Sequence, residues 1–266
     1  MVSELGRTPS EDAEQFDALS PALWNPVGNA VVAAARLQID DHVLDAFCRA
    51  GASAVPAAQT VGKIGVVDAV DPSAAMLEVA GRKAKAFDLG QLNLAHSDPL
   101  SWTIEGSYDA IVASYELFTA QDIDAVGNRL ATLLKPGGRF AVSVWANGAH
   151  AEFAEALTDI CARHQPDTAE QASLVAENAR RTDTPEELEK WLTSLGLGNV
   201  EIAPTEVSVP LNADLAWSLV EGTWYSRLLP EDPGTRGEIR ARLCQELGEN
   251  YVLNANTLIA VAEPTL

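Results

Sequence analysis

The chain has 266 residues, of which 47% are hydrophobic, and this supplies enough apolar material for a full globular core. Its 38 acidic residues against 18 basic ones give a net charge of −20, so phosphate backbones and anionic lipid surfaces are repelled, and neither nucleic acid nor an acidic membrane is expected as a partner. Three scattered cysteines favour neither a disulfide framework nor a zinc site. With no apolar targeting core and no membrane-spanning run, we expect a cytoplasmic protein.

The first half of the chain alternates between short apolar runs and helical segments. Residues 16–24 and 29–37 indicate short helical pieces that precede the alternation. The predicted strands cover residues 43–48, 64–70, 92–96, 108–114 and 139–145, and the predicted helices cover residues 51–61, 72–87 and 120–134. Strands that alternate with helices at this spacing predict a parallel sheet with helices on both faces.

The second half of the chain is richer in helical patterns. Thr184 and Pro185 are typical of a helix start, with Thr184 as the N-cap. Residues 165–181 are polar and fit either a helix or a mobile lid. Helices are also predicted over 151–164, 185–196, 214–229 and 236–247, and strands over 199–211 and 257–262. The fold class predicted is α/β: a Rossmann-like, seven-stranded, mostly parallel sheet with a late antiparallel strand, helices on both faces and a helical cap.

The segment after the first predicted strand indicates a nucleotide site. In doubly wound sheets the ligand binds at the carboxyl ends of the strands, and glycines let the first loop approach it closely. Here Gly51 is retained, but Phe47 and Arg49 occupy two positions where such loops usually carry glycine. Asp71 ends the second predicted strand, 20 positions after Gly51. An acidic residue there either binds the hydroxyls of a ribose or caps the following helix, and the two roles are compatible.

Four segments in order resemble one family. They are residues 43–51, the stretch AVDPSAAML at 69–77, the stretch YDAIV at 108–112, and the stretch LLKPGGR at 133–139. Together they resemble class I S-adenosylmethionine-dependent methyltransferases over residues 15–146. The resemblance is greatest to small-molecule enzymes similar to the ubiquinone and menaquinone methyltransferases, so it implies S-adenosyl-L-methionine as cofactor.

The resemblance implies a role for each matching residue. Asp45, near the end of the first strand, matches the acidic residue that faces the methionine amino group. Asp71 matches the ribose ligand, and Pro72 and Met76 flank the adenine. Asp98 matches the acidic side chain that meets the adenine amino group. Ser114 leaves the fourth strand where the family lines the methionine arm and the acceptor pocket.

One departure from the family pattern leaves two functions open. The family's loop usually reads Asp-x-Gly-x-Gly-x-Gly, whereas this chain reads Asp-Ala-Phe-Cys-Arg-Ala-Gly from Asp45 to Gly51. If Phe47 and Arg49 crowd the methionine arm, the chain is a non-catalytic binding module with a blocked cofactor site. If Arg49 instead pairs with a carboxylate, the cofactor still binds. A dinucleotide dehydrogenase is disfavoured because the loop lacks two glycines, and a hydrolase because no Gly-x-Ser-x-Gly elbow is present.

We therefore predict methyl transfer from S-adenosyl-L-methionine to a small or lipophilic acceptor. Residues 1–40 are predicted to contribute helices to the acceptor pocket, 41–146 to form the cofactor-binding core, and 147–266 to supply cap insertions and the last strands. The oligomeric state, a homodimer included, stays open. No residue is assigned as catalytic, because alignment of the acceptor with an activated methyl group does most of the work. The candidates for a general base are Tyr115, Glu116, His150 and Tyr225.

Overall fold

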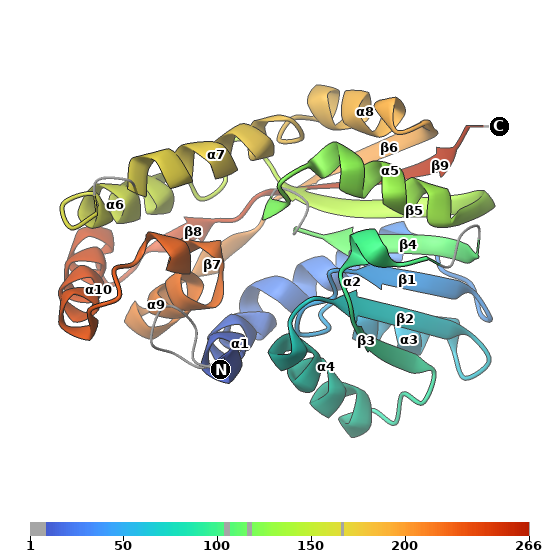
Figure 1. Cartoon of the computed structure of the whole chain (residues 1–266), viewed down its shortest axis with the longest axis horizontal. Helices are drawn as coiled ribbons and strands as arrows, with labels where there is room; N and C mark the ends of the chain where they lie inside the picture. The colour runs from blue at the N-terminus through green and yellow to red at the C-terminus, as the bar shows by residue number, and fades with distance from the viewer. Residues whose placement is uncertain (1–8, 104–106, 116–118, 166–167, 266) are drawn as a thin grey trace.

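A seven-stranded sheet forms the centre of the computed structural model, which describes residues 9–103, 107–115, 119–165 and 168–265 (Figure 1). The strand order is β3-β2-β1-β4-β5-β9-β6. Strands β1 to β5 run parallel, whereas β9 is antiparallel to both of its neighbours. The strands are β1 (His42–Ala46), β2 (Val66–Asp71), β3 (Leu92–His96), β4 (Tyr108–Ser114), β5 (Leu134–Trp145), β6 (Leu197–Thr205) and β9 (Thr257–Pro264). The predicted mostly parallel sheet with a late antiparallel strand is confirmed.

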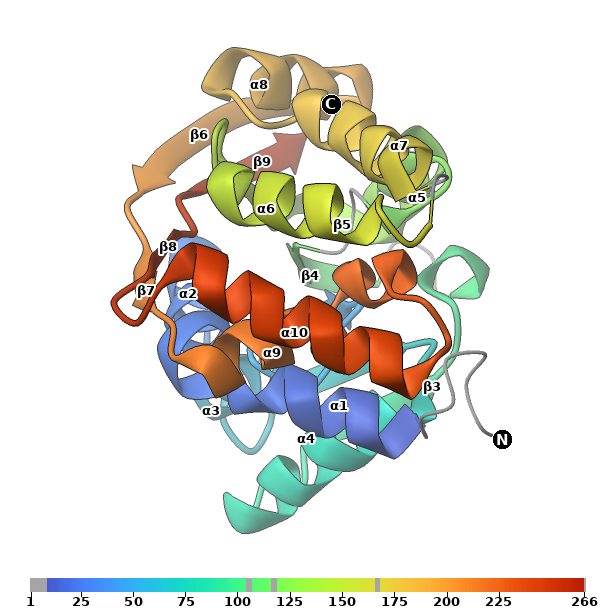
Figure 2. The same ribbon diagram turned by 90° about the vertical axis from the view of Figure 1, so that its left-hand side faces the viewer.

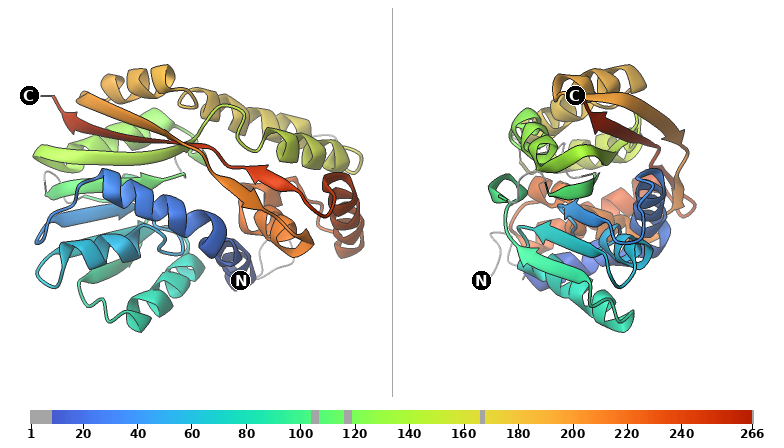
Figure 3. Two further views of the ribbon diagram at one scale, coloured as in Figure 1. Left: turned by 180° about the vertical axis from the view of Figure 1, so that it is seen from behind. Right: turned by 90° about the vertical axis from the view of Figure 1, so that its right-hand side faces the viewer.

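Two hydrophobic cores lie on the two faces of this sheet. Successive residues of a strand point to opposite faces, so Val43 joins one core and Leu44 the other. Helices α2 (Asn25–Ala34), α3 (Ala54–Val61) and α4 (Ala74–Ala86) cover the first face. Helices α5 (Ile123–Leu133) and α8 (Pro185–Ser194) cover the second. Helix α5 lies in front of the sheet in Figure 1, and α2 lies in front of it in the left view of Figure 3.

A helical cap gathers at one end of the sheet and faces the viewer in Figure 2. Helix α1 packs along α9, and α6 packs along α10. Among the described residues, no helix combines the length and hydropathy needed to cross a membrane. The cap consists of α1 (Pro9–Ala18), a π-helical turn (Ser20–Trp24), α6 (Ala151–Cys161), α7 (Thr168–Arg180), α9 (Ala213–Gly222), a 3₁₀ turn (Trp224–Leu228), α10 (Pro233–Leu247) and a hairpin of β7 (Ser208–Pro210) with β8 (Val252–Asn254).

Polar caps fix several helix starts. The Thr184 hydroxyl accepts a hydrogen bond from the backbone N–H of Glu187, so the predicted cap of α8 is confirmed. Ser73 does the same for Met76 at the start of α4. That helix therefore begins at Ala74, two residues later than predicted, and its N-cap is Ser73 rather than Asp71.

Other predicted element boundaries also differ from the structure, most clearly at three places. The single strand over 199–211 divides into β6 and β7, because the Val207 backbone turns to hydrogen-bond with Asn256 and Ala255. The helix over 214–229 ends at Gly222, where extended Thr223 caps a separate 3₁₀ turn. Ile64 lies outside β2 and is 73% exposed, because that strand begins only at Val66. The segment 165–181, predicted as a helix or a lid, contains helix α7.

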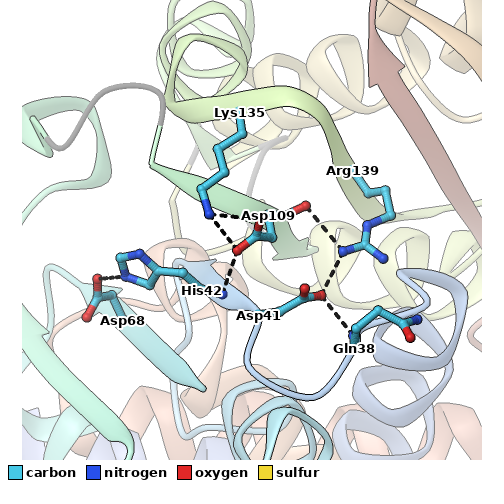
Figure 4. Close-up of polar contacts among 7 residues, drawn as sticks. All are labelled: Gln38, Asp41, His42, Asp68, Asp109, Lys135 and Arg139. Carbon is cyan, nitrogen blue, oxygen red and sulfur yellow. Dashed lines mark hydrogen bonds and ion pairs between the residues drawn. The ribbon is translucent and has the colours of Figure 1, made fainter. Parts of the chain in front are cut away.

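The LLKPGGR segment lies at the amino ends of the parallel strands (Figure 4). The Lys135 ammonium donates to both carboxylate oxygens of Asp109 at 2.8 Å, and Arg139 pairs with Asp41 at 2.7 Å. The backbone N–H of His42 also donates to Asp109 at 2.9 Å. Burial alone would raise the pKa of the Asp109 carboxyl, but the Lys135 and His42 hydrogen bonds hold it below its usual value. This motif therefore ties β1, β4 and β5 together.

Candidate functional site

A cavity of about 300 Å³ lies where the carboxyl ends of β1, β4 and β5 meet the helical cap. This is the edge of an open α/β sheet at which ligands bind. The loop after β1, the start of α4 and the last residues of β4 and β5 form one side of the cavity. Residues of α1, α9 and the 3₁₀ turn form the other side. Segments far apart in the sequence therefore enclose one site.

The loop after β1 follows a path that usually requires glycine. Phe47 has a φ of 59°, Arg49 of 48° and Gly51 of 83°. A left-handed conformation costs a non-glycine residue about 1–2 kcal/mol, so two residues of this loop are strained. At Gly51 a side chain would also crowd helix α4, because an added Cβ would lie 3.2 Å from the Cβ of Ala80. Gly51 is thus required by both its backbone angle and its packing.

The side chains of Phe47 and Arg49 both line the cavity. The Arg49 guanidinium lies over the Phe16 ring of helix α1, with its central carbon 4.9 Å from the ring centroid. Cations favour this position over an aromatic face. The bulky loop residues therefore form part of the wall of the site, and one of them brings a positive charge to it.

The Asp71 carboxylate is fully buried and joins three segments. One oxygen accepts a hydrogen bond from the backbone N–H of Arg49 at 3.0 Å, and the other accepts one from the N–H of Ser73 at 2.8 Å. Asp71 ends β2, so it connects that strand to the β1 loop and to the start of α4. It is not among the residues that line the cavity. In this conformation Asp71 anchors the loop.

Asp45 is buried beneath the same loop. One of its carboxylate oxygens, Oδ2, accepts a hydrogen bond from the Ser53 hydroxyl at 2.8 Å. The other, Oδ1, has no hydrogen-bond partner among the described residues. Burial raises the pKa of Asp45 to about 7, against the lowering effect of Ser53 and with a smaller rise from the charge of Asp71. A cation that reached Oδ1 would favour its ionised form.

The other predicted site residues divide into two groups. Met76 and Ser114 line the cavity, and the Ser114 hydroxyl has no hydrogen-bond partner among the described residues. Pro72 and Asp98 are exposed and do not line it, and the Asp98 carboxylate accepts a hydrogen bond from the N–H of Leu100. Four of the nine predicted site residues thus line the cavity, and five do not. The four are Phe47, Arg49, Met76 and Ser114, and the five are Asp45, Gly51, Asp71, Pro72 and Asp98.

Aromatic rings make up much of the remaining wall. Tyr115 stacks on Trp145 with ring centroids 3.8 Å apart, and Trp24 meets the edge of Tyr115 at 6.0 Å. Phe16 stacks on Trp24 at 4.6 Å. The sequence pattern predicted helical segments around Trp24 but gave no role in the site to Trp145. Its position as the last residue of a predicted parallel strand was the signal that could have identified it.

The candidate general bases differ in what their polar atoms contact. The Thr257 hydroxyl donates to the backbone carbonyl of Ala255, so the Tyr115 hydroxyl donates to Thr257 and is already engaged. Burial also raises the pKa of Tyr115. The Tyr225 hydroxyl and His150 Nδ1 lie 3.3 Å apart, and burial lowers the pKa of His150 to about 3. Tyr115 is therefore a wall residue and His150 a neutral ring. Glu116 lies outside the described residues.

Comparisons with known proteins agree with this arrangement. A family model for a methyltransferase domain matches residues 43–138. The aklanonic acid methyltransferase DauC of a Streptomyces species is 29% identical over 132 residues, which cover 49% of this chain and 60% of DauC. The demethylmenaquinone methyltransferase of Symbiobacterium thermophilum is 30% identical over 135 residues, which cover 48% of this chain and 53% of that protein. The chain thus spans about half the length of the curated relatives it matches.

The fold is also found among solved structures. The structure of phosphoethanolamine N-methyltransferase 2 from Haemonchus contortus, in complex with S-adenosyl-L-methionine, gives a TM-score of 0.60 at 15% identity. That match covers 97% of this chain and 57% of the other, and at this identity it speaks for the fold alone. Residues 43–138 thus match a methyltransferase domain, and the sheet order and the related sequences agree with that match.

Proposed function

We propose that this protein transfers a methyl group from S-adenosyl-L-methionine to a small-molecule acceptor. The observation that carries the proposal is the cavity at the carboxyl ends of β1, β4 and β5, whose lining includes both the altered loop and the aromatic rings. The match to a methyltransferase domain at 43–138 includes nearly all of β1, the whole of β4 and the first residues of β5. The curated relatives named above are enzymes of small-molecule methylation, which favours an acceptor of that kind.

Unmatched polar atoms support the fit of the cofactor. Asp45 Oδ1 and the Ser114 hydroxyl are buried without a hydrogen-bond partner among the described residues. S-adenosyl-L-methionine carries an ammonium group, which suits Asp45, and a carboxylate, which suits the Arg49 guanidinium at the cavity wall. Phe47 and Met76 offer apolar surface to the adenine. We propose that these residues hold the cofactor, while Gly51 and Asp71 maintain the loop and Pro72 and Asp98 remain outside the contact surface.

The protein's contribution to the reaction is then alignment and exclusion of water. The bound cofactor supplies an activated methyl group on its sulfonium sulfur, so the acceptor atom needs mainly to be held in line with it. In the division of labour that we propose, residues 1–40 supply Phe16 and Trp24, residues 41–146 hold the cofactor, and residues 147–266 close the acceptor side. The Tyr115 hydroxyl is already engaged with Thr257, so Tyr115 is not assigned as a base.

Calorimetry with the full chain tests the proposal. S-adenosyl-L-methionine and S-adenosylhomocysteine should both bind with one site per chain, and NAD should not. Methylation is then followed by mass spectrometry on small aromatic and lipophilic acceptors. Absence of binding by both adenosyl compounds would leave the chain as a methyltransferase-fold binding module, and preferential binding of NAD would favour a dehydrogenase.

A further inference from the structure

His150 and Tyr225 form a buried polar pair on the acceptor side of the cavity. Both residues line the cavity, and their exposed fractions are 8% and 3%. His150 stands at the N-cap position of helix α6, and Tyr225 lies in the 3₁₀ turn that follows α9. The Tyr225 hydroxyl is 3.3 Å from His150 Nδ1, and the Trp145 ring lies 4.3 Å from the imidazole, centroid to centroid. The imidazole is thus held between two aromatic side chains.

The tyrosine hydroxyl determines which imidazole nitrogen carries the proton. Within the described chain, the contact with His150 Nδ1 is the hydrogen bond that the structure gives for the Tyr225 hydroxyl. A buried hydroxyl uses its proton where an acceptor is present, so Tyr225 donates and Nδ1 accepts. Burial lowers the pKa of His150 to about 3, so the ring is neutral at physiological pH. Its single proton is therefore on Nε2.

That Nε2–H group is buried without a hydrogen-bond partner among the described residues. An unmatched buried donor is costly, and such groups are rare in folded proteins outside functional sites. The backbone gives a second, independent observation. Within the described chain, eight non-glycine residues have a positive φ, and four of these line this one cavity. Strain of this kind clusters at ligand sites. The four are Phe47, Arg49, Tyr115 and His150.

We infer that His150 Nε2–H donates a hydrogen bond to an oxygen of the acceptor, and that Tyr225 is the positioning residue that keeps the proton on Nε2. The inference rests on the proposed function and names its acceptor class. The stacked pair of Tyr115 and Trp145 favours a flat, aromatic or conjugated molecule. A neutral N–H donor suits a carbonyl or an ionised hydroxyl and disfavours an ammonium group at that place. Because Nε2 carries the proton, His150 binds the acceptor and is not its general base.

A matched pair of probes tests this assignment without any cofactor. 1-Tetralone and tetralin differ by one carbonyl oxygen, and their affinities for the full chain are measured by calorimetry. The readout is the ratio of the two affinities, which a merely structural role of His150 would not alter. His150→Phe should lower the tetralone preference by about tenfold, the equivalent of one ordinary hydrogen bond, and leave tetralin binding in place. His164→Phe, a change at an exposed histidine away from the cavity lining, should leave the ratio unchanged.

Tyr225→Phe provides a second variant that keeps the imidazole. Nitrogen-15 spectra of histidine-labelled protein should show His150 with its proton on Nε2 in the native chain and on a mixture of both nitrogens in Tyr225→Phe. The tetralone preference should fall in that variant as well. An equal ratio in native and His150→Phe protein, binding of neither probe, or a native proton on Nδ1 would each overturn the inference. Failure of S-adenosyl-L-methionine to bind would instead remove the proposed function and leave these measurements unaffected.

Discussion

The Asp71 carboxylate offers a sharp test of how the altered loop is held. Asp71→Ala removes the acceptor of two backbone N–H groups, those of Arg49 and Ser73, at a fully buried site. Hydrogen bonds to charged groups contribute about 1.5–3 kcal/mol each, and an unmatched buried donor is penalised further. The two bonds share one carboxylate and are not independent. We therefore expect the free energy of unfolding to fall by about 3–4 kcal/mol.

Urea unfolding followed by circular dichroism measures this loss. Asp98→Ala is the matched control, since Asp98 is exposed and accepts one backbone hydrogen bond at the start of a short 3₁₀ turn. The free energy of unfolding of this control variant should fall by about 1 kcal/mol or less. If Asp71→Ala cost no more than Asp98→Ala, Asp71 would not anchor the loop, and its carboxylate would be available for a ribose.

Three further predictions concern the loop and the sheet. The raised pKa of Asp45 means that its contribution to stability is complete below the unfolded pKa of 3.8 and is lost as pH rises to about 7. The free energy of unfolding of the native chain relative to Asp45→Asn, measured with urea, should therefore fall over this range by up to about 1.4 kcal/mol per pH unit. It should not change above pH 8. A difference between the two proteins that is the same at every pH would contradict the burial argument. Gly51→Ala should lower the free energy of unfolding by about 2–3 kcal/mol in the same assay. Gly137→Ala is the control and should lower it by about 1 kcal/mol, because Gly137 has a positive φ but open space around it. Equal losses would exclude crowding by Ala80. Lys135→Ala breaks the half-exposed ion pair with Asp109 and should lower the free energy of unfolding by less than about 1 kcal/mol. The affinity for the cofactor, measured by calorimetry, should stay within about twofold of the native value. A larger loss of affinity would place the LLKPGGR segment in the cofactor site.

The inner strands of the sheet could be predicted from sequence because they are buried on both faces, as β1, β2, β4 and β9 show. Continuous apolar runs such as 108–114 coincide with the observed strand β4, and the alternation with helices fixed the parallel topology. Boundaries were less predictable where a tertiary contact decides them. Strand β6 ends just before Val207, whose backbone N–H donates a hydrogen bond to the Asn256 side chain. Strand β8 is short and pairs with β7. Neither contact leaves a local signal in the sequence.

The candidate site was predictable in its location but not in its contacts. The family pattern pointed to the loop that holds Phe47 and Arg49, and both residues line the cavity. It could not reveal that the Asp71 carboxylate bonds to the backbone of that same loop, because this depends on the left-handed turn at Arg49. The pairing of His150 with Tyr225 joins residues 75 positions apart, and spacing in the sequence gives no indication of it.

We propose that the altered loop, with Phe47 and Arg49 in place, accommodates the cofactor. Calorimetry of S-adenosyl-L-methionine binding to the native chain and to the Phe47→Gly, Arg49→Gly double variant tests it most directly. Because Arg49 brings a cation to the cavity wall, the native chain should bind, and the double variant should bind more weakly. Binding that is absent from the native chain and appears only after both glycine changes would contradict the account, since the two side chains would then block the cofactor site.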